Sequence, residues 1–142
     1  MTIATILEAK GTAVVSVTAE TTVIDVVRIL AEKRIGAVPV VEEGRVIGIF
    51  SERDVVYGLA REGAAVLDQP VRAVMTSPAV TVDRQTKIIT AFAMMTRRRI
   101  RHLPVVENDE LIGFVSIGDL VKRRVDAIEA EAEAMLSYIQ QV

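Results

Sequence analysis

Apolar residues occur along the chain in blocks whose spacing changes in a fixed order. The β-branched run Val14–Val17 predicts a short strand. From Thr22 to Lys33 the apolar residues recur at helical spacing, which predicts an amphipathic helix. Two apolar runs, Ala37–Val41 and Val46–Phe50, flank a glycine-containing turn and predict a β-hairpin, and helical spacing resumes over Ser51–Ala60. The pattern therefore predicts a unit of strand, helix, strand, strand and helix.

The second half of the chain repeats this unit. An offset of 65 positions takes Pro39 onto Pro104 and keeps its register from one end of the unit to the other. The aligned segments are Arg34–Glu42 with Arg99–Glu107 and Ile47–Asp54 with Ile112–Asp119. The same order of strands and helices is therefore expected from Ala79 to about Val125.

These patterns predict an α/β (α+β) protein built from two repeats. We expect the first repeat over residues 1–61, a polar connector over 62–70, the second repeat over 71–125 and a C-terminal helical extension over 126–142. The strands are too apolar for the uncovered face of either small sheet to meet water, so the repeats should pack sheet edge to sheet edge about a pseudo-twofold axis. Clefts between packed repeats are natural ligand sites.

Composition narrows the chemistry that such clefts can support. Of the 142 residues 51% are hydrophobic and the net charge is −2, so we expect a buried core and no general affinity for nucleic acid. The chain has no cysteine and one histidine, His102, which argues against disulfides, thiolate nucleophiles and ordinary metal sites. No nucleophile with an adjacent base and no phosphate-loop motif occurs, so no enzyme activity is expected. Without an evident membrane span or targeting segment, we expect a cytoplasmic protein.

Three motifs in this order resemble the CBS family, whose members occur as tandem pairs called Bateman modules. They are the helix start Thr21–Asp25, the segments Ile35–Val40 and Ile100–Val105, and a Gly-x-x-Ser-x-x-Asp pattern present once per repeat. The resemblance extends from about Ile3 to Val125. It implies two CBS motifs that bind an adenosine-type nucleotide in the clefts between them.

The resemblance also implies which residues bind the nucleotide. The aspartates Asp54 and Asp119 would receive the ribose hydroxyls, and Ser51 and Ser116, at helix starts, would donate to phosphate. Backbone groups for the adenine edge would come from Ala37, Val38, Pro39, His102, Leu103 and Pro104. AMP or NADH is the preferred ligand, because one concentrated basic patch suits one or two phosphates. ATP and S-adenosylmethionine remain alternatives, and no metal is required.

The Ser-x-x-Asp pattern has a second interpretation. A serine followed three residues later by an acidic residue is also an ordinary helix capping box, which needs no ligand. The two roles are compatible, because a capped helix start still presents free N–H groups to an anion.

The repeats differ in basic residues. The second repeat carries Arg97, Arg98, Arg99, Arg101 and His102 where the first has one lysine and one arginine. In a nucleotide-sensing member of the family, basic residues at the positions of Arg101 and His102 hold phosphate. For Arg97 and Arg98 we expect instead the solvated end of a helix, favoured by its C-terminal dipole. Arg53, beside the first aspartate, is expected to pair either with phosphate or with a nearby glutamate.

The C-terminal segment carries a heptad stripe. Its apolar members are Val121, Val125, Ile128, Ala132, Met135, Ile139 and Val142. Spacings of four and three place them on one face of a helix, which needs a partner surface. Docking on its own domain and packing across a homodimer are both consistent with the stripe, and a homodimer is the preferred expectation.

The leading hypothesis is therefore a non-catalytic regulatory or sensor module. Nucleotide binding would change the disposition of the two repeats, and an effector protein, a change of assembly or ligand storage would provide the output. The alternative is a structural or interaction module that has no nucleotide ligand.

Overall fold

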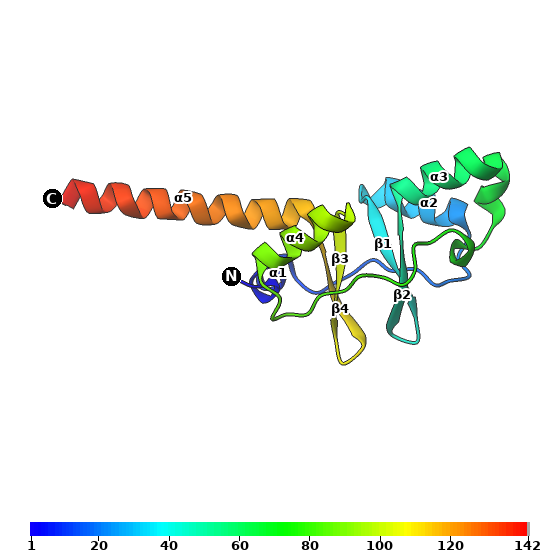
Figure 1. Ribbon diagram of the computed structural model, residues 1–142, viewed down its shortest axis with the longest axis horizontal. Helices are drawn as coiled ribbons and strands as arrows, with labels where there is room; N and C mark the ends of the chain where they lie inside the picture. Colours follow the sequence, from blue (N-terminus) through cyan, green and yellow to red (C-terminus); the bar gives the residue numbers. More distant parts are fainter. Residues whose placement is uncertain (142) are drawn as a thin grey trace.

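Two antiparallel β-hairpins lie side by side at the centre of the molecule, and each carries its own helices (Figure 1). The computed structural model describes residues 1–141. The elements are α1 Ile3–Lys10, α2 Val23–Lys33, β1 Ala37–Glu42, β2 Arg45–Ser51, α3 Glu52–Glu62, the 3-10 helices η1 Gly63–Asp68 and η2 Val71–Ala73, α4 Ile88–Arg98, β3 His102–Glu107, β4 Glu110–Ser116 and α5 Ile117–Gln141. The fold is thus the expected mixture of helices with small antiparallel sheets in two repeats.

Local chemistry explains where these elements begin and turn. The Thr22 hydroxyl accepts a hydrogen bond from the Asp25 N–H at 3.4 Å and caps the start of α2. Glu43 and Gly44, with φ of 52° and 80°, form a two-residue turn of left-handed conformation, which matches the twist of a hairpin. Asn108 and Asp109 repeat this turn between β3 and β4.

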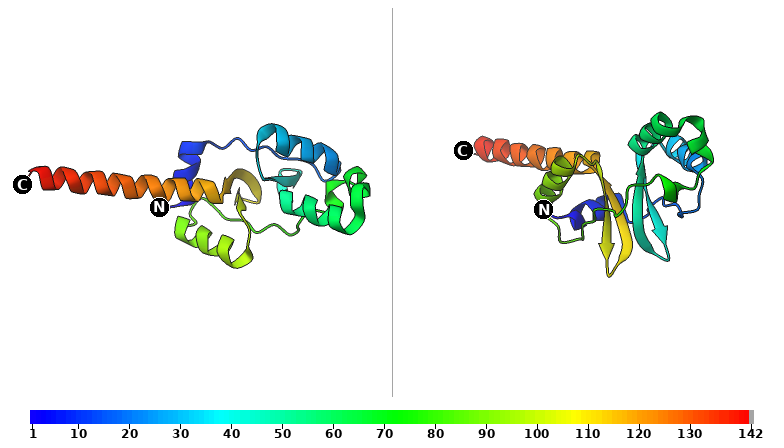
Figure 2. Two further views of the ribbon diagram at one scale, coloured as in Figure 1. Left: turned by 90° about the horizontal axis from the view of Figure 1, so that it is seen from above. Right: turned by 45° about the vertical axis from the view of Figure 1, so that its right-hand side comes forward.

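The predicted strand Val14–Val17 is wrong in extent. Only Val17 forms a β-bridge, parallel to Val40, and Val82 does the same with Val105 in the second repeat. The physical reason is that residues 11–16 cross from one hairpin to the other, so a single residue lies alongside β1 before the chain enters α2. The left view of Figure 2 shows this crossing.

The segment predicted as a polar connector is part of a core. Residues 63–68 form η1, and Val66 within it is only 1% exposed. Gly58 of α3 lies so close to Val66 that an added Cβ would approach its Cγ2 to 3.0 Å. Polar composition concealed this role, because one buried valine is enough to fix the segment. The boundaries at 61, 70 and 125 stay a prediction.

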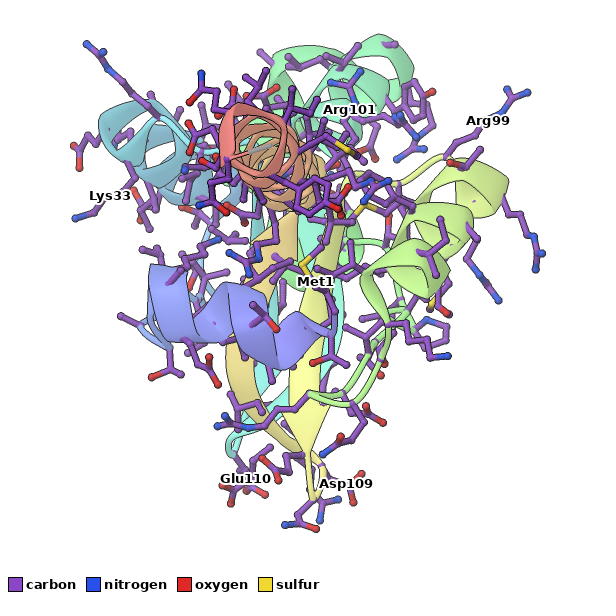
Figure 3. The ribbon with its side chains drawn as sticks, turned by 90° about the vertical axis from the view of Figure 1, so that its left-hand side faces the viewer. Met1, Lys33, Arg99, Arg101, Asp109 and Glu110 are labelled. Atoms are coloured by element: carbon purple, nitrogen blue, oxygen red, sulfur yellow. The ribbon has the colours of Figure 1, made fainter. Side chains whose placement is uncertain are left out.

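The two cores exchange segments. Lobe 1, as we call the body around β1 and β2, is completed by Val66, Val71 and Val74, which lead into the second repeat. Lobe 2, around β3 and β4, is completed by Ile3, Ile6 and Leu7 of α1, which lead into the first repeat. Figure 3, which looks along α5, shows α1 and α4 on the two sides of the β3–β4 hairpin. Each lobe therefore includes a segment that, in the sequence, directly precedes the repeat of the other lobe.

Two repeat-related glycines permit these exchanges. A Cβ on Gly48 of β2 would lie 2.7 Å from Met75 Sδ and 2.9 Å from the Thr76 carbonyl oxygen. A Cβ on Gly113 of β4 would lie 2.6 Å from Leu7 Cδ2. The space beside these glycines is thus filled by Leu7, Met75 and Thr76, which come from segments outside the two hairpins.

Helix α5 begins on lobe 2 and projects away from both lobes as a rod (Figures 1 and 2). The predicted second repeat and C-terminal extension are therefore joined within one continuous helix. Over residues 1–141, no helix combines the length and the apolar character that crossing a bilayer requires.

Substitution of the close-packed glycines tests the exchange. Gly48→Ala should lower the free energy of unfolding by about 1–3 kcal/mol, because its methyl group meets a backbone oxygen that cannot move alone. Gly113→Ala should cost less, because the flexible end of Leu7 can shift. Urea unfolding measures both values. Gly118→Ala is the control, since its nearest contact is an ordinary 3.6 Å and alanine favours the helix. Equal losses for Gly48→Ala and Gly118→Ala would contradict the packing.

Candidate functional site

Two cavities lie between the lobes and are related by the repeat. In cavity 1, the start of α3 in lobe 1 faces the segment before β3 in lobe 2. Its volume is about 390 Å³. Its principal lining residues are Ser51, Arg53, Asp54, Thr76, Ala79, Val80, Arg99, Ile100, Arg101 and His102.

In cavity 2 the two lobes exchange their roles. The start of α5 in lobe 2 faces the segment before β1 in lobe 1, and the volume is again about 390 Å³. Its principal lining residues are Lys10, Val14, Val15, Arg34, Ile35, Gly36, Ala37, Phe114, Ser116 and Asp119. Each cavity therefore combines the aspartate of one repeat with the residues that precede the first hairpin strand of the other repeat.

Asp54 in cavity 1 is held by hydrogen bonds on both oxygens. Its Oδ2 accepts from the Ser51 N–H at 2.9 Å, and the Ser51 hydroxyl accepts from the Asp54 N–H at 3.4 Å, so the predicted capping box is present. Its Oδ1 accepts from the Thr76 hydroxyl at 3.0 Å. Thr76 is a neutral donor, so Asp54 has no cationic partner in this contact.

Asp119 in cavity 2 has a cationic partner instead. Its Oδ2 accepts from the Ser116 N–H at 2.8 Å and from Lys10 Nζ at 2.7 Å. The same ammonium group donates to the Phe114 carbonyl oxygen at 2.8 Å. Burial raises the pKa of Asp119, but the hydrogen bonds and charge of Lys10, together with the Ser116 N–H, lower it below its usual value. Asp119 is therefore ionised and partly neutralised by Lys10 at neutral pH.

His102 lines both cavities. Its ring stacks on Phe114 with centroids 5.6 Å apart and an interplanar angle of 14°. A Cβ on Gly36, which faces it from lobe 1, would lie 3.3 Å from the ring. Burial, and then the charge of Lys10, lower the pKa of His102 below the ordinary 6.5, with Asp119 opposing and Arg101 adding to the effect. His102 is thus a neutral partition between the cavities near pH 7.

The basic residues of the second repeat divide between the cavity and the surface. All four arginines are exposed, but Arg99 and Arg101 also line cavity 1, whereas Arg97 and Arg98, in the last turn of α4, do not, as expected of a solvated helix end. Figure 3 shows Arg99 and Arg101 on the side of α4 and Lys33 on the other side. Cavity 1 therefore has the cationic wall that the sequence predicted for the second repeat.

Arg53 makes a hydrogen bond that was not considered from sequence, and its expected pairing with phosphate stays a prediction. Its Nη1 donates to the Arg99 carbonyl oxygen at 2.7 Å, at the left-handed C-terminal residue of α4. The predicted glutamate pairing is therefore wrong, because the unpaired carbonyl at the helix end offers an acceptor within reach. This hydrogen bond joins α3 of lobe 1 to α4 of lobe 2 beside cavity 1.

Four residues predicted to lie at the site belong to the core. Val38, Pro39, Leu103 and Pro104 are buried and do not line either cavity, whereas Ala37 and His102 do. The carbonyl oxygens of Pro39 and Pro104 accept from the N–H groups of Val17 and Val82. The prolines thus provide acceptors that anchor the crossing segments, behind the walls of the cavities.

Sequence reasoning missed Lys10, Thr76 and Gly36. Lys10 is the last residue of α1, and Thr76 follows η2. The contacts of these segments with Asp119 and Asp54 were not predicted. Alignment of the two repeats could have drawn attention to two of these residues, because the offset of 65 aligns Lys10 with Met75 and Gly36 with Arg101. Such mismatches mark positions where the two cavities differ.

Together these groups provide the elements of a site for an anionic polar ligand. Cavity 1 combines a carboxylate acceptor, the positive end of the α3 dipole and three arginines, Arg53, Arg99 and Arg101, within one open volume. Within residues 1–141, no three histidine, aspartate or glutamate side chains form a group that could hold a metal ion.

Comparison with known proteins gives the family. The CBS domain matches residues 11–61 and 71–126. A mitochondrial CBS domain-containing protein of Arabidopsis thaliana is 35% identical over 128 residues, which cover 87% of this chain and 62% of the relative. The chain thus spans about three fifths of that protein.

Solved structures give the same assignment. A CBS-domain containing protein from Agrobacterium tumefaciens is 39% identical, with a TM-score of 0.84 over 87% of this chain and 99% of that chain. A CBS domain protein from Pyrobaculum aerophilum, solved in complex with AMP, is 29% identical, with a TM-score of 0.78 over 93% and 99% of the two chains. With one match in each repeat and the fold in common, this chain belongs to the CBS domain family and is a tandem CBS protein.

Proposed function

We propose that the chain is a non-catalytic regulatory module that binds an adenosine-type nucleotide in cavity 1, with AMP as the first candidate. The observation that carries this proposal is the pairing of Asp54 at a helix start with the arginine wall of the other lobe, across one cavity. A carboxylate suits two ribose hydroxyls, and helix N–H groups with guanidinium groups suit phosphate. The AMP complex of the Pyrobaculum relative supports the same ligand class.

The size and charge of cavity 1 favour AMP over the alternatives. A volume of about 390 Å³ lies near the lower end of the range of roughly 300–1,000 Å³ for small-molecule sites. A mononucleotide suits this volume better than NADH, the second candidate. ATP and S-adenosylmethionine share the adenosine half, but the two carboxylates of Glu52 and Asp54 offset part of the charge of Arg53, Arg99 and Arg101, which leaves too little positive charge to balance a triphosphate.

Cavity 2 is less suited to a ribose in its present form. The Lys10 ammonium group donates to Oδ2 of Asp119, so a ribose hydroxyl would compete with a charged donor for this carboxylate. At Asp54 it would compete only with the neutral hydroxyl of Thr76 and the groups of Ser51. We therefore propose one high-affinity nucleotide per chain.

The proposal extends to the partners of the module. The exposed apolar residues of α5 and α3 support a homodimer. An effector protein or a change of assembly would provide the output of nucleotide binding. The cytoplasmic location stays a prediction. A structural module without a nucleotide is the second candidate, and the capping boxes of Asp54 and Asp119, which stabilise helices without any ligand, favour it.

Asp54→Ala tests the ribose site. We expect the AMP dissociation constant to rise about tenfold or more, because two hydrogen bonds to a charged acceptor are lost. Asp119→Ala, the repeat-related control, should change it by less than about threefold, a ratio that corresponds to under 1 kcal/mol. Isothermal titration on protein shown to be folded by its unfolding transition measures both. Equal effects of the two substitutions would argue against cavity 1 as the site.

Arg101→Ala tests the phosphate end. The affinity for AMP should fall about tenfold through loss of a charge-assisted hydrogen bond, while the affinity for adenosine, which lacks phosphate, stays the same. Arg97→Ala is the matched control, because Arg97 is exposed in the last turn of α4. A parallel loss of adenosine binding in Arg101→Ala would show that this residue acts on the fold of the cavity instead.

A further inference from the structure

Helix α5 extends far beyond the lobe on which it begins. It contains 25 residues, and residues 128–141 are all exposed. Seven large apolar side chains along it are between 45% and 69% exposed, namely Val121, Val125, Ile128, Met135, Leu136, Tyr138 and Ile139. Docking on its own domain, one of the two interpretations from sequence, is therefore wrong for this part of the helix. An isolated helix is only marginally stable in water, so the projecting part needs another partner.

The apolar residues form a coiled-coil face. Val121, Val125, Ile128, Ala132, Met135 and Ile139 follow the alternating spacing of four and three that defines heptad positions d and a. Val142, the last member of the predicted stripe, lies outside the described residues. A seam of this kind is covered by a second helix with the same spacing, and α5 of another copy has it.

The charges beside the seam determine which way the second helix runs. Lys122 and Arg124 lie in the first turns of α5, and Glu129 and Glu131 lie two turns later, at positions e and g. If the helices are antiparallel and Val125 meets Ile128 of the second copy, Lys122 faces Glu129 and Arg124 faces Glu131. The twofold axis doubles these pairs, so four opposite-charge pairs form and no like-charge pair does.

A parallel arrangement of the two helices forms fewer opposite-charge pairs. Only Arg124 would face Glu129 of the second copy, while Lys122 would face Ile117 and Glu131 would face Leu136. Two opposite-charge pairs would form instead of four. Charge complementarity therefore favours the antiparallel register.

The antiparallel register also covers apolar surface beyond the seam. Met135 would meet Gly118 of the second copy, which is exposed and has no Cβ to obstruct it. In Figures 1 and 2 the axis of α5, continued past its first residue, leads toward α2 and α3. The distal end of the partner helix would run in that direction, toward the exposed Val56 and Tyr57 of α3.

We propose that the chain forms a homodimer in which α5 pairs with α5 of a second copy as an antiparallel coiled coil. The interface and the nucleotide site are separate surfaces, because the seam residues line neither cavity 1 nor cavity 2.

Charge exchange tests the direction of the pairing. In sedimentation equilibrium of the full chain, Glu131→Lys should raise the dimer dissociation constant about tenfold, because two attractive pairs become repulsive. Arg124→Glu should weaken the dimer similarly. The double variant R124E/E131K should restore the wild-type value, since the two exchanged charges face each other again. In a parallel dimer, Glu131→Lys would have no effect and the double variant would stay weak, which would overturn the antiparallel register.

A second pair of variants tests the seam itself. Ile128→Asp should make the chain monomeric, because it places a charge at a d position. Ala130→Asp, two residues away on the outer face of the same exposed helix, should leave the dimer intact. Both variants should keep the AMP affinity of the wild type, which shows that the lobes are folded. A wild-type chain that stays monomeric at high micromolar concentration, or an Ile128→Asp variant that remains dimeric, would overturn the proposal.

Discussion

The structure depends on the exchange of core segments between the lobes. Each hydrophobic core is complete only when the segment that leads into the other repeat packs against it, and Gly48 and Gly113 provide the space for this contact. Neither lobe can separate without exposing its own core, so the cavities between them have a defined shape. The same crossing segments carry Lys10 and Thr76 to the two aspartates. Core formation and the chemistry of the cavities therefore have one structural origin.

Much of the fold could be predicted from the sequence because the repeat keeps its register and local chemistry fixes its turns and caps. The Glu43–Gly44 turn and the Ser51 cap, for example, follow from a few adjacent residues. The exchange could not be predicted, because it depends on contacts between residues far apart in sequence, such as Leu7 with Gly113. For the same reason Val14–Val17 was overestimated as a strand and Val66 was missed as a core residue.

The candidate site was also predicted only in part from the sequence. Asp54, Arg101 and His102 were predicted from motif and charge, and all three line cavity 1. The motif did not separate residues that line a cavity from those behind its wall, so Leu103 and Pro104 were included although they are buried. In β3 the residues Leu103, Pro104 and Val105 are all buried, so only the first residue of the strand, His102, reaches the cavity, and the motif alone does not mark where the strand enters the core. The hydrogen bond from Arg53 to the Arg99 carbonyl was also hidden, because its acceptor is a backbone atom.

A nucleotide in cavity 1 would contact both lobes beside that bond, and it can shift their arrangement only through a difference in affinity between two arrangements. The two cavities differ most in the donor that contacts the aspartate: the Lys10 ammonium group at Asp119 and the neutral Thr76 hydroxyl at Asp54. Calorimetric titration of AMP into the ligand-stripped chain, beside the variant Lys10→Met that copies the repeat-related Met75, tests this difference most directly. We predict one site per chain in the wild type and a second site in the variant. Two equal sites in the wild type, or no binding at all, would contradict the account.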